Sequence, residues 1–289
     1  MTVKDELRGR FNSLSPALQR IAKYVLDHPN EVVISSMRTV GISADARPAT
    51  LVRFAQQLGF AGWPELKQAI AQEMGLGREA YGDRARSLLE RASEQGLAGE
   101  IFQVHKANLE ATERHSRSGL NDAAVLLEAA PNVHVAGFRA CFPIAFSFVY
   151  VYRLFRNSVH LIDGQGGSLE MQTRSMTEED ALLVISFAPY SREVLQVVEA
   201  GKRAGCKVIA ITDSDASPLS LLADVTLLFS TQSPSFFPSI TSGMALTESL
   251  LELLVSRAGK PVIDRIESAE AHLFESGAYV DAGGRSRGS

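Results

Sequence analysis

The sequence predicts two domains of different classes: an all-α amino-terminal domain, then an α/β domain with a five-stranded parallel sheet, doubly wound in an α/β/α arrangement. Three observations predict this. Apolar residues recur at helical spacing through residues 14–74, and no convincing strand pattern comes before residue 130. Beyond residue 130, five short apolar runs alternate with helical segments, as in a parallel sheet buried on both faces. The glycine-bearing stretch GLGREAYGD, residues 75–83, separates the two patterns.

Composition indicates an ordinary globular protein of 289 residues, of which 45% are apolar and 21% charged, long enough for two hydrophobic cores. Cys141 and Cys206 are the only cysteines, which excludes a disulfide framework and fits a reducing cytoplasm. We see no signal-peptide pattern, and the longest apolar stretch, residues 140–152, contains a proline and is shorter than the ~20 residues that cross a bilayer. We therefore expect a cytoplasmic protein without a membrane partner.

Charge is distributed unevenly along the chain. Residues 1–77 hold nine lysines and arginines against seven acidic residues, a net charge of +2. Because the whole chain carries −4, the remaining residues carry −6. This difference permits a nucleic-acid-binding amino-terminal domain without requiring one.

Short helices account for the amino-terminal domain. The first begins near Pro16, which a first helical turn tolerates, and ends at the His-Pro-Asn sequence of residues 28–30. Its apolar residues share one helical face: Leu14, Leu18, Ile21, Ala22 and Val25. The segments expected after it are 31–35, 37–42, 48–58 and a final helix that starts near Pro64.

The break at residues 75–83 is the expected domain boundary. The helices expected after it lie at about 84–94, 97–115 and 122–130. The chain is therefore expected to divide into a helical domain at 1–77, a linker with connecting helices at 78–120, an α/β domain at 121–265 and a disordered tail at 277–289.

The expected strands are short runs rich in valine, isoleucine and leucine: 132–138, 158–164, 181–188, 206–212 and 225–230. A helix over about 193–204 is the clearest of those between them, and a long helix over about 242–257 closes the domain. In doubly wound folds, ligands bind past the carboxyl ends of the strands, where anions meet backbone N–H groups and helix amino termini. The loops that follow the strands are therefore the candidate ligand-binding loops.

Residues 36–60 have the spacing of a helix-turn-helix. The inward face of its second helix is expected to be Leu51, Phe54, Ala55 and Leu58. The opposite face and the helix start present residues that could reach base edges or phosphates in a major groove: Arg47, Ala49, Thr50, Arg53 and Gln57. From spacing alone, a small helical bundle with a solvated polar face explains the pattern about equally well.

The sequence LVRFAQQLGFAGWPELKQ, residues 51–68, resembles the signature of the RpiR-type bacterial transcriptional regulators. In that family a recognition helix ends in a Leu-Gly-Phe turn, and a further helix starts with a Pro-Glu-Leu-Lys-like stretch. Members usually have a Gly-Val-Ser-Pro-like turn whose serine caps the recognition helix, whereas residues 45–48 here read Asp-Ala-Arg-Pro. Because arginine cannot accept the capping hydrogen bond, either Asp45 caps the helix or Arg47 itself contacts DNA.

Five stretches of the second domain together resemble the SIS (sugar isomerase) domain, the usual carboxy-terminal partner of RpiR-type helix-turn-helix domains. They are GFRACF (137–142), LIDGQGGSLE (161–170), ISFAPYSREV (185–194), AITDSDASPLSLLADVTLL (210–228) and SFFPSITSGMALTESLLELL (235–254). With the first domain, and in this order, the resemblance covers about residues 10–275. It also implies dimer contacts through the helix 242–257 and the helices around 84–130.

In many SIS domains the loop after the third strand reads Ser-x-Ser-Gly-x-Thr-x-Glu and binds a sugar phosphate. The aligned residues 186–193 keep two hydroxyls and the glutamate, but Ala188 loses a hydroxyl and Pro189 removes one amide donor. Arg139 and Arg192 could supply charge-assisted hydrogen bonds instead. The ligand-binding residues that the resemblance implies are Arg139, Cys141, Ser186, Phe187, Tyr190, Ser191, Arg192, Glu193 and Thr212.

Three functions remain open. We expect a sequence-specific DNA-binding regulator, a repressor of genes of carbohydrate metabolism or transport, which acts on operator DNA as a dimer or tetramer and responds to a phosphorylated sugar. The alternatives are a sugar-phosphate isomerase, for which Glu193 lacks an assigned acid–base partner, and a DNA-binding regulator whose cleft no longer holds a ligand. Neither a metal-ligand spacing nor a GxGxxG fingerprint is present, so we expect neither a metal nor a cofactor.

Overall fold

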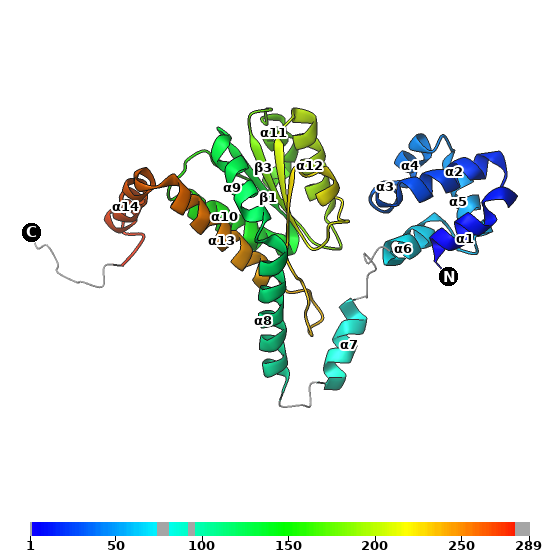
Figure 1. Ribbon diagram of the computed structural model, residues 1–289, viewed down its shortest axis with the longest axis horizontal. Helices are drawn as coiled ribbons and strands as arrows, with labels where there is room; N and C mark the ends of the chain where they lie inside the picture. The colour runs from blue at the N-terminus through cyan, green and yellow to red at the C-terminus, as the bar shows by residue number, and fades with distance from the viewer. Residues whose placement is uncertain (1, 74–80, 92–95, 281–289) are drawn as a thin grey trace, which may run out of the picture.

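The computed structural model describes residues 2–73, 81–91 and 96–280, and its architecture confirms the fold class: a helical amino-terminal region, then an all-parallel α/β region (Figure 1). The helices of the first region are α1 (Val3–Arg10), α2 (Pro16–Asp27), α3 (Pro29–Ile34), α4 (Met37–Ser43), α5 (Pro48–Gln57) and α6 (Trp63–Glu73). The apolar periodicity did not predict α1. Its start is fixed by a capping box, in which Thr2 and Asp5 exchange side-chain and backbone hydrogen bonds.

The helical region has one core, which confirms the inward face expected for α5. Leu51, Phe54 and Ala55 are fully buried there, and Leu58 is nearly so. Of the two alternatives for the turn between α4 and α5, capping by Asp45 is wrong: Arg47 is the N-cap residue, and no side chain caps the helix. Asp45 instead adopts a left-handed backbone conformation (φ 47°) at the end of α4, two residues too early to cap.

Gly41 allows α4 to pack closely against the backbone of this turn. An added Cβ would lie 2.7 Å from the carbonyl oxygen of Ala46, which is backbone and cannot rotate away. We expect Gly41→Ala to destabilise the helical region by about 1–3 kcal/mol. Trp63, the only tryptophan of the chain, is buried in this core, so its fluorescence during urea unfolding reports on this region alone.

The matched control is Gly9→Ala, since Gly9 lies on α1 and an added Cβ meets nothing within 4 Å. Alanine there should stabilise the helix by about 0.5–1 kcal/mol. Equal unfolding midpoints for the two variants would contradict the packing role of Gly41.

Three helices lead to the sheet: α7 (Tyr81–Arg91), α8 (Leu97–Ser116) and α9 (Gly119–Ala129). Most of the expected break at 75–83 and the expected helix end at 94 lie outside the described residues. The part of the break that is described, from Tyr81 to Asp83, is helical and forms the first turn of α7. Side chains four residues apart on α8 dock it beside the end of the sheet: Asn108 donates to Gln232 O (2.7 Å), Thr112 accepts from Ser230 N (2.9 Å), and Ser116 donates to Leu228 O (2.7 Å).

The five expected strands form one parallel sheet in the order β2-β1-β3-β4-β5. They are β1 (Val133–Gly137), β2 (Val159–Ile162), β3 (Ala181–Ile185), β4 (Lys207–Thr212) and β5 (Val225–Leu228). The chain passes outward from β1 to β2 and then returns to β3, so the order reverses at β1 and β3. This reversal opens the ligand crevice of doubly wound folds at the carboxyl ends of these two strands.

Helices cover both faces of the sheet (Figure 1). One face carries α9, α10 (Phe142–Tyr152) and α13 (Thr241–Ala258), and the other carries α11 (Leu169–Arg174) and α12 (Arg192–Ala204). Successive residues of β3 alternate between the two layers: Leu183 and Ile185 pack with the first set, Leu182 and Val184 with the second. Short 3-10 helices occur at Phe11–Ser13, Arg139–Cys141, Gln165–Gly167 and Ser220–Leu222.

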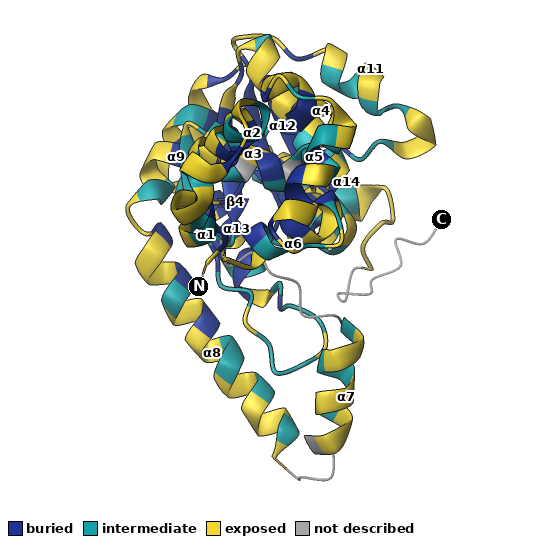
Figure 2. Cartoon of the chain, turned by 90° about the vertical axis from the view of Figure 1, so that its right-hand side faces the viewer, coloured by how far each residue is buried: buried dark blue, intermediate teal, exposed yellow. Residues whose placement is uncertain are grey.

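A final helix, α14 (Lys260–Glu275), extends away from the sheet and was not expected from the sequence (Figure 1). Val262 is its only buried residue, so the helix packs little of its surface against the core. Of the expected disordered tail, residues 281–289 lie outside the described part, and Tyr279 and Val280 are exposed. Figure 2 shows large exposed surfaces on α7 and α8 as well. None of the helices in the described ranges is long and apolar enough to span a membrane.

Candidate functional site

The first candidate surface lies on α4 and α5. Arg47, Ala49, Arg53 and Gln57 are exposed and Thr50 is half-buried, so the five residues expected to face DNA lie on the side of α5 opposite its core face. A groove of about 870 Å³ runs between α2, α4 and the start of α5. Arg20, Arg38 and Arg47 line it, with Asp45 as its only carboxylate.

Sequence reasoning missed Arg20 and Arg38 as part of this surface. Both are exposed, and Arg38 stands in the first turn of α4, whose amino terminus is capped by Ser36. Arg38 was within the quoted helix-turn-helix stretch, so its place on the first helix could have indicated it. Arg20 comes from α2, and only the fold brings it to within 3.8 Å of Asp45.

The second candidate site is a cavity of about 450 Å³ at the carboxyl ends of β1 and β3. Seven of the nine residues expected to bind a ligand line it: Arg139, Cys141, Ser186, Phe187, Tyr190, Ser191 and Arg192. Glu193 and Thr212 do not line it. Glu193 accepts a hydrogen bond from Arg139, which lines the cavity, and Thr212 donates to Asp213, which also accepts from the lining residue Tyr190. The strand order therefore gathers the first and third loops into one cleft.

Arg139 and Glu193 form an ion pair across the two loops, with 2.8 Å between Arg139 Nη2 and Glu193 Oε1. A hydrogen bond from its own backbone amide and the adjacent Arg139 guanidinium lower the pKa of Glu193 below its ordinary value. Glu193 is thus held as a carboxylate. Its second oxygen, Oε2, is buried and makes no hydrogen bond among the described residues.

The loop after β3 is bound internally to the end of β4. Asp213 accepts hydrogen bonds from the Tyr190 hydroxyl (2.8 Å), the Ala188 amide (3.2 Å) and the Thr212 hydroxyl (3.3 Å). Burial and the Asp213 carboxylate raise the pKa of Tyr190 well above its ordinary value, so the phenol stays protonated and donates. Ser191 caps α12 by accepting from the Val194 amide (3.2 Å), which engages its hydroxyl oxygen.

The loop after β1 is shaped by packing. A Cβ on Gly137 would lie 2.7 Å from the Cys141 carbonyl oxygen and 2.9 Å from Ala145 Cβ, so this glycine has a structural role. Arg139 takes a left-handed conformation (φ 54°), which glycine adopts more readily. Burial raises the pKa of Cys141 to about 12, so its thiol is neither a nucleophile nor an anion at neutral pH.

An aromatic wall of the cleft was not predicted. Phe138 follows β1, Phe237 precedes α13, and Tyr81 comes from the first turn of α7. The ring centroids of Tyr81 and Phe237 are 5.2 Å apart, and Phe187 packs edge-on against Phe237 at 6.5 Å. Arg84, one turn further along α7, donates to the Ser233 carbonyl oxygen (3.4 Å). No local sequence signal could place a residue of α7 in this cleft.

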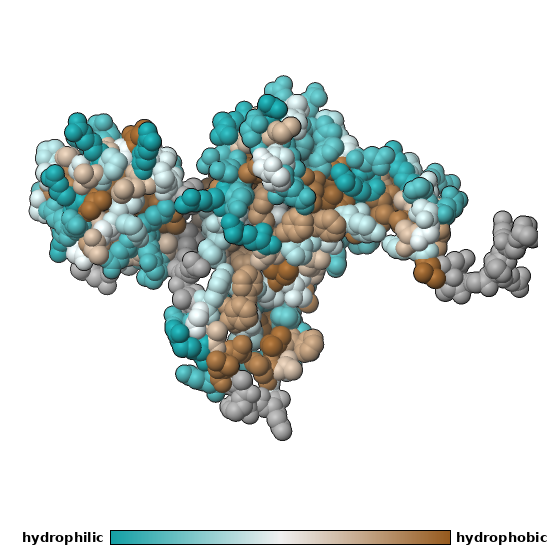
Figure 3. Space-filling view, turned by 180° about the vertical axis from the view of Figure 1, so that it is seen from behind, coloured by the Kyte–Doolittle hydropathy of each residue, from teal (hydrophilic) through white to brown (hydrophobic). Residues whose placement is uncertain are grey.

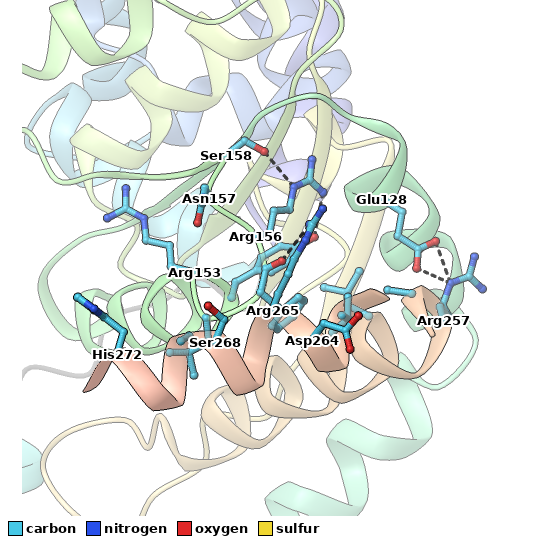
Figure 4. A pocket seen from close by; sticks show the side chains of 17 residues that line it. Glu128, Arg153, Arg156, Asn157, Ser158, Arg257, Asp264, Arg265, Ser268 and His272 are labelled. Carbon is cyan, nitrogen blue, oxygen red and sulfur yellow. Dashed lines mark hydrogen bonds and ion pairs between the residues drawn. The ribbon is translucent and has the colours of Figure 1, made fainter. Parts of the chain in front are cut away.

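A larger cavity of about 1050 Å³ lies beneath α14, at the opposite end of the sheet, and arginines line it (Figure 4). These side chains are already engaged: Arg257 pairs with Glu128 at 3.0 Å, and Arg153 donates to Val159 O (2.7 Å). Arg156 donates to Leu127 O (2.6 Å), to the Tyr152 and Ser158 hydroxyls and to two further carbonyls. These arginines bind the end of α9, the residues after it and the start of β2, so the smaller cleft is the better ligand site. No group of three or more potential metal ligands occurs within the described ranges.

A helix-turn-helix with an exposed basic face, followed by a doubly wound domain with a cleft at its switch point, defines a class: transcriptional regulators with a ligand-binding domain. The model of the helix-turn-helix domain of the rpiR family matches residues 1–76, and that of the SIS domain matches residues 126–256. The chain is therefore an RpiR-type transcriptional regulator with a SIS domain, and the resemblance expected from its sequence is confirmed.

Similar proteins include another transcriptional regulator. The transcriptional regulator HexR of Escherichia coli K12 is 23% identical over 285 residues, which cover 96% of each chain. Two solved structures share the fold. One is the sugar isomerase domain of an RpiR transcription factor from Sphaerobacter thermophilus (19% identical, 61% of this chain and 99% of that one, TM-score 0.59). The other is the Vibrio vulnificus NanR protein complexed with ManNAc-6P (17% identical, 94% and 98%, TM-score 0.58).

Proposed function

We propose that the protein binds operator DNA through α4 and α5 as a homo-oligomer, and that a small metabolite in the SIS cleft changes its DNA affinity. A phosphorylated sugar is the first candidate, and repression of genes of carbohydrate metabolism or transport is the expected output. The observation that carries this proposal is the joining of an exposed, arginine-bearing helix pair to a cleft whose wall includes Tyr81. NanR, whose fold is similar, was solved with a sugar phosphate.

The path from cleft to DNA runs through α7. Tyr81 lies against Phe237 in the cleft, and α7 is the first described helix after α6, which ends the helical region. A ligand that changes the Tyr81–Phe237 contact therefore acts on the segment that leads to the DNA-binding helices. Coupling of this kind typically amounts to about 1–3 kcal/mol and is reciprocal, so operator DNA must change ligand affinity by the same factor.

An isomerase is the less favoured candidate. Aldose–ketose isomerisation needs a base with a pKa near neutrality beside the substrate. Glu193 has a lowered pKa and is paired with Arg139, and no histidine lines the cleft in the described part of the chain. This arrangement supports ligand binding without turnover.

Assembly into a homo-oligomer is supported by apolar side chains on α7 and α8. Leu89, Phe102 and Leu109 are exposed, and Figure 3 shows apolar surface over the lower ends of these two helices. A dimer would bury this surface and present two α5 helices to the half-sites of a palindromic operator. Sedimentation velocity on the full chain tests this, and a monomer at micromolar concentration would reject it.

The proposal is tested by mobility shift on the DNA that flanks the protein's own gene, at low salt, with and without a panel of sugar phosphates. We expect retardation of a promoter fragment and its reversal by one member of the panel. The control is an equally long fragment from within the coding region. Absence of retardation on every promoter fragment, together with measurable aldose–ketose conversion, would establish the isomerase instead.

A further inference from the structure

Asp213 accepts hydrogen bonds from two donors of the loop that borders the cleft, the Ala188 amide and the Tyr190 hydroxyl. The carboxyl ends of parallel strands and the amino terminus of the following helix form the edge where a doubly wound fold binds anions. In this chain that edge is the loop between β3 and α12. The donors there are the Ala188 amide, the Tyr190 hydroxyl and the first amides of α12.

Side chains of the protein already engage these donors. Asp213 Oδ2 accepts from the Ala188 amide (3.2 Å), and Oδ1 accepts from the Tyr190 hydroxyl (2.8 Å). Ser191 Oγ accepts from the Val194 amide (3.2 Å). Pro189 has no amide hydrogen to offer. Two donors of the loop, one of them the hydroxyl of the cleft-lining Tyr190, are thus bound to a carboxylate that lies just behind the cleft wall.

We propose that Asp213 is an internal competitor for the phosphate of a ligand and the residue that sets the phosphate affinity of the cleft. A phosphate that binds the β3–α12 loop must displace the carboxylate from Ala188 and Tyr190. The inference rests on the proposed function in taking this cleft as the effector site, and it adds how the site selects among effectors. Arg139 and Arg192 line the same cleft and supply the positive charge for an anion that enters.

The competition has two physical sources. Neutralising Asp213 removes the repulsion between two like charges that share one set of donors, and it weakens the bonds that a phosphate must break. Two unit charges about 6 Å apart, at an effective dielectric constant of about 40, repel enough to change a dissociation constant about tenfold. Asp213→Asn keeps the size of the side chain and an acceptor for Tyr190, so the loop remains supported.

The test is isothermal titration calorimetry on the full chain with inorganic phosphate, and with glucose 6-phosphate and glucose as a matched pair. We expect Asp213→Asn to bind both phosphates about tenfold more tightly than the unsubstituted protein, with no gain for glucose. The control is Asp215→Asn, which removes the same charge from an exposed position two residues further along the loop. It should change phosphate affinity less than twofold.

Asp213→Ser is the second variant, because it also removes the charge and keeps a hydroxyl beside Tyr190. Thermal unfolding establishes whether each variant is folded. If Asp213→Asn does not fold, the phosphate affinity of Asp213→Ser tests the proposal. Equal or weaker phosphate binding by the folded variants, or an equal gain in Asp215→Asn, overturns the proposal. The mobility-shift result is independent of this one. If the protein retards no DNA but its phosphate affinity rises when Asp213 is replaced, the proposed operator binding is refuted, whereas the proposed competition by Asp213 stands.

Discussion

Arg53→Ala is expected to weaken operator binding by about 1–3 kcal/mol, roughly fivefold to 150-fold in Kd, while the unfolding temperature stays within about 1 °C. Arg53 is exposed on the side of α5 opposite Leu51 and Phe54, so its removal leaves the core intact. A guanidinium at this place in a recognition helix can form two parallel hydrogen bonds to guanine or pair with phosphate. Titration by fluorescence anisotropy on an operator fragment measures the loss.

The matched control is Arg8→Ala, because Arg8 is an exposed arginine of the same region on α1, outside the α4–α5 pair. It removes the same charge and should change affinity less than threefold. The salt dependence of Kd separates the two kinds of contact: loss of a phosphate contact lowers the slope by about one, whereas loss of a base contact leaves the slope and reduces discrimination between sequences. Unaltered operator affinity in Arg53→Ala would refute the placement of α5 in the groove.

Asp180→Ala is expected to destabilise the SIS domain by about 1–3 kcal/mol. The Asp180 side chain is 1% exposed and joins two segments at the amino-terminal edge of the sheet, the start of β1 and the turn before β3. Its oxygens accept from Asn132 Nδ2 (2.9 Å), from the Thr177 amide (2.9 Å) and from the Thr177 hydroxyl (3.0 Å). Oδ2 also lies 3.4 Å from His134 Nε2 on β1. Truncation leaves these donors without their acceptor and the buried His134 without its neighbouring carboxylate.

Differential scanning calorimetry measures this loss on the transition of the SIS domain. The control is Glu179→Ala, which removes a neighbouring carboxylate that is exposed. It should shift the transition by little, since exposed charges contribute about 0–1 kcal/mol. If the unfolding transition of Asp180→Ala shifts no more than that of Glu179→Ala, the hydrogen bonds of Asp180 do not stabilise the domain as proposed.

Local patterns predicted most of the fold. Apolar spacing predicted the inward face of α5. A helix has 3.6 residues per turn, so Leu51, Phe54 and Leu58 lie on one side of it in any context. The same reasoning found the five strands, of which the central three, β1, β3 and β4, are buried almost throughout. It failed for α14, which packs little of its surface against the core, and for α1, whose start depends on a capping box.

The candidate site was predicted in part. The loop after β3 follows directly in sequence from a buried strand, so Ser186, Tyr190 and Ser191 could be expected at the cleft. The hydrogen-bond partners of these residues could not be predicted from the sequence. Ser191 is engaged as the cap of α12, and Tyr190 is bound to Asp213, 23 residues later in the chain.

The sequence by itself determined the class of each domain, their order along the chain and the exposed face of α5, because these follow from local periodicity. Only the tertiary structure decided that Asp213 takes the donors of the β3–α12 loop, that Asp180 braces the other end of the sheet, and that Tyr81 walls the cleft. Each of these contacts joins residues from different elements. Their geometry depends on strand order and helix packing, which no local pattern specifies.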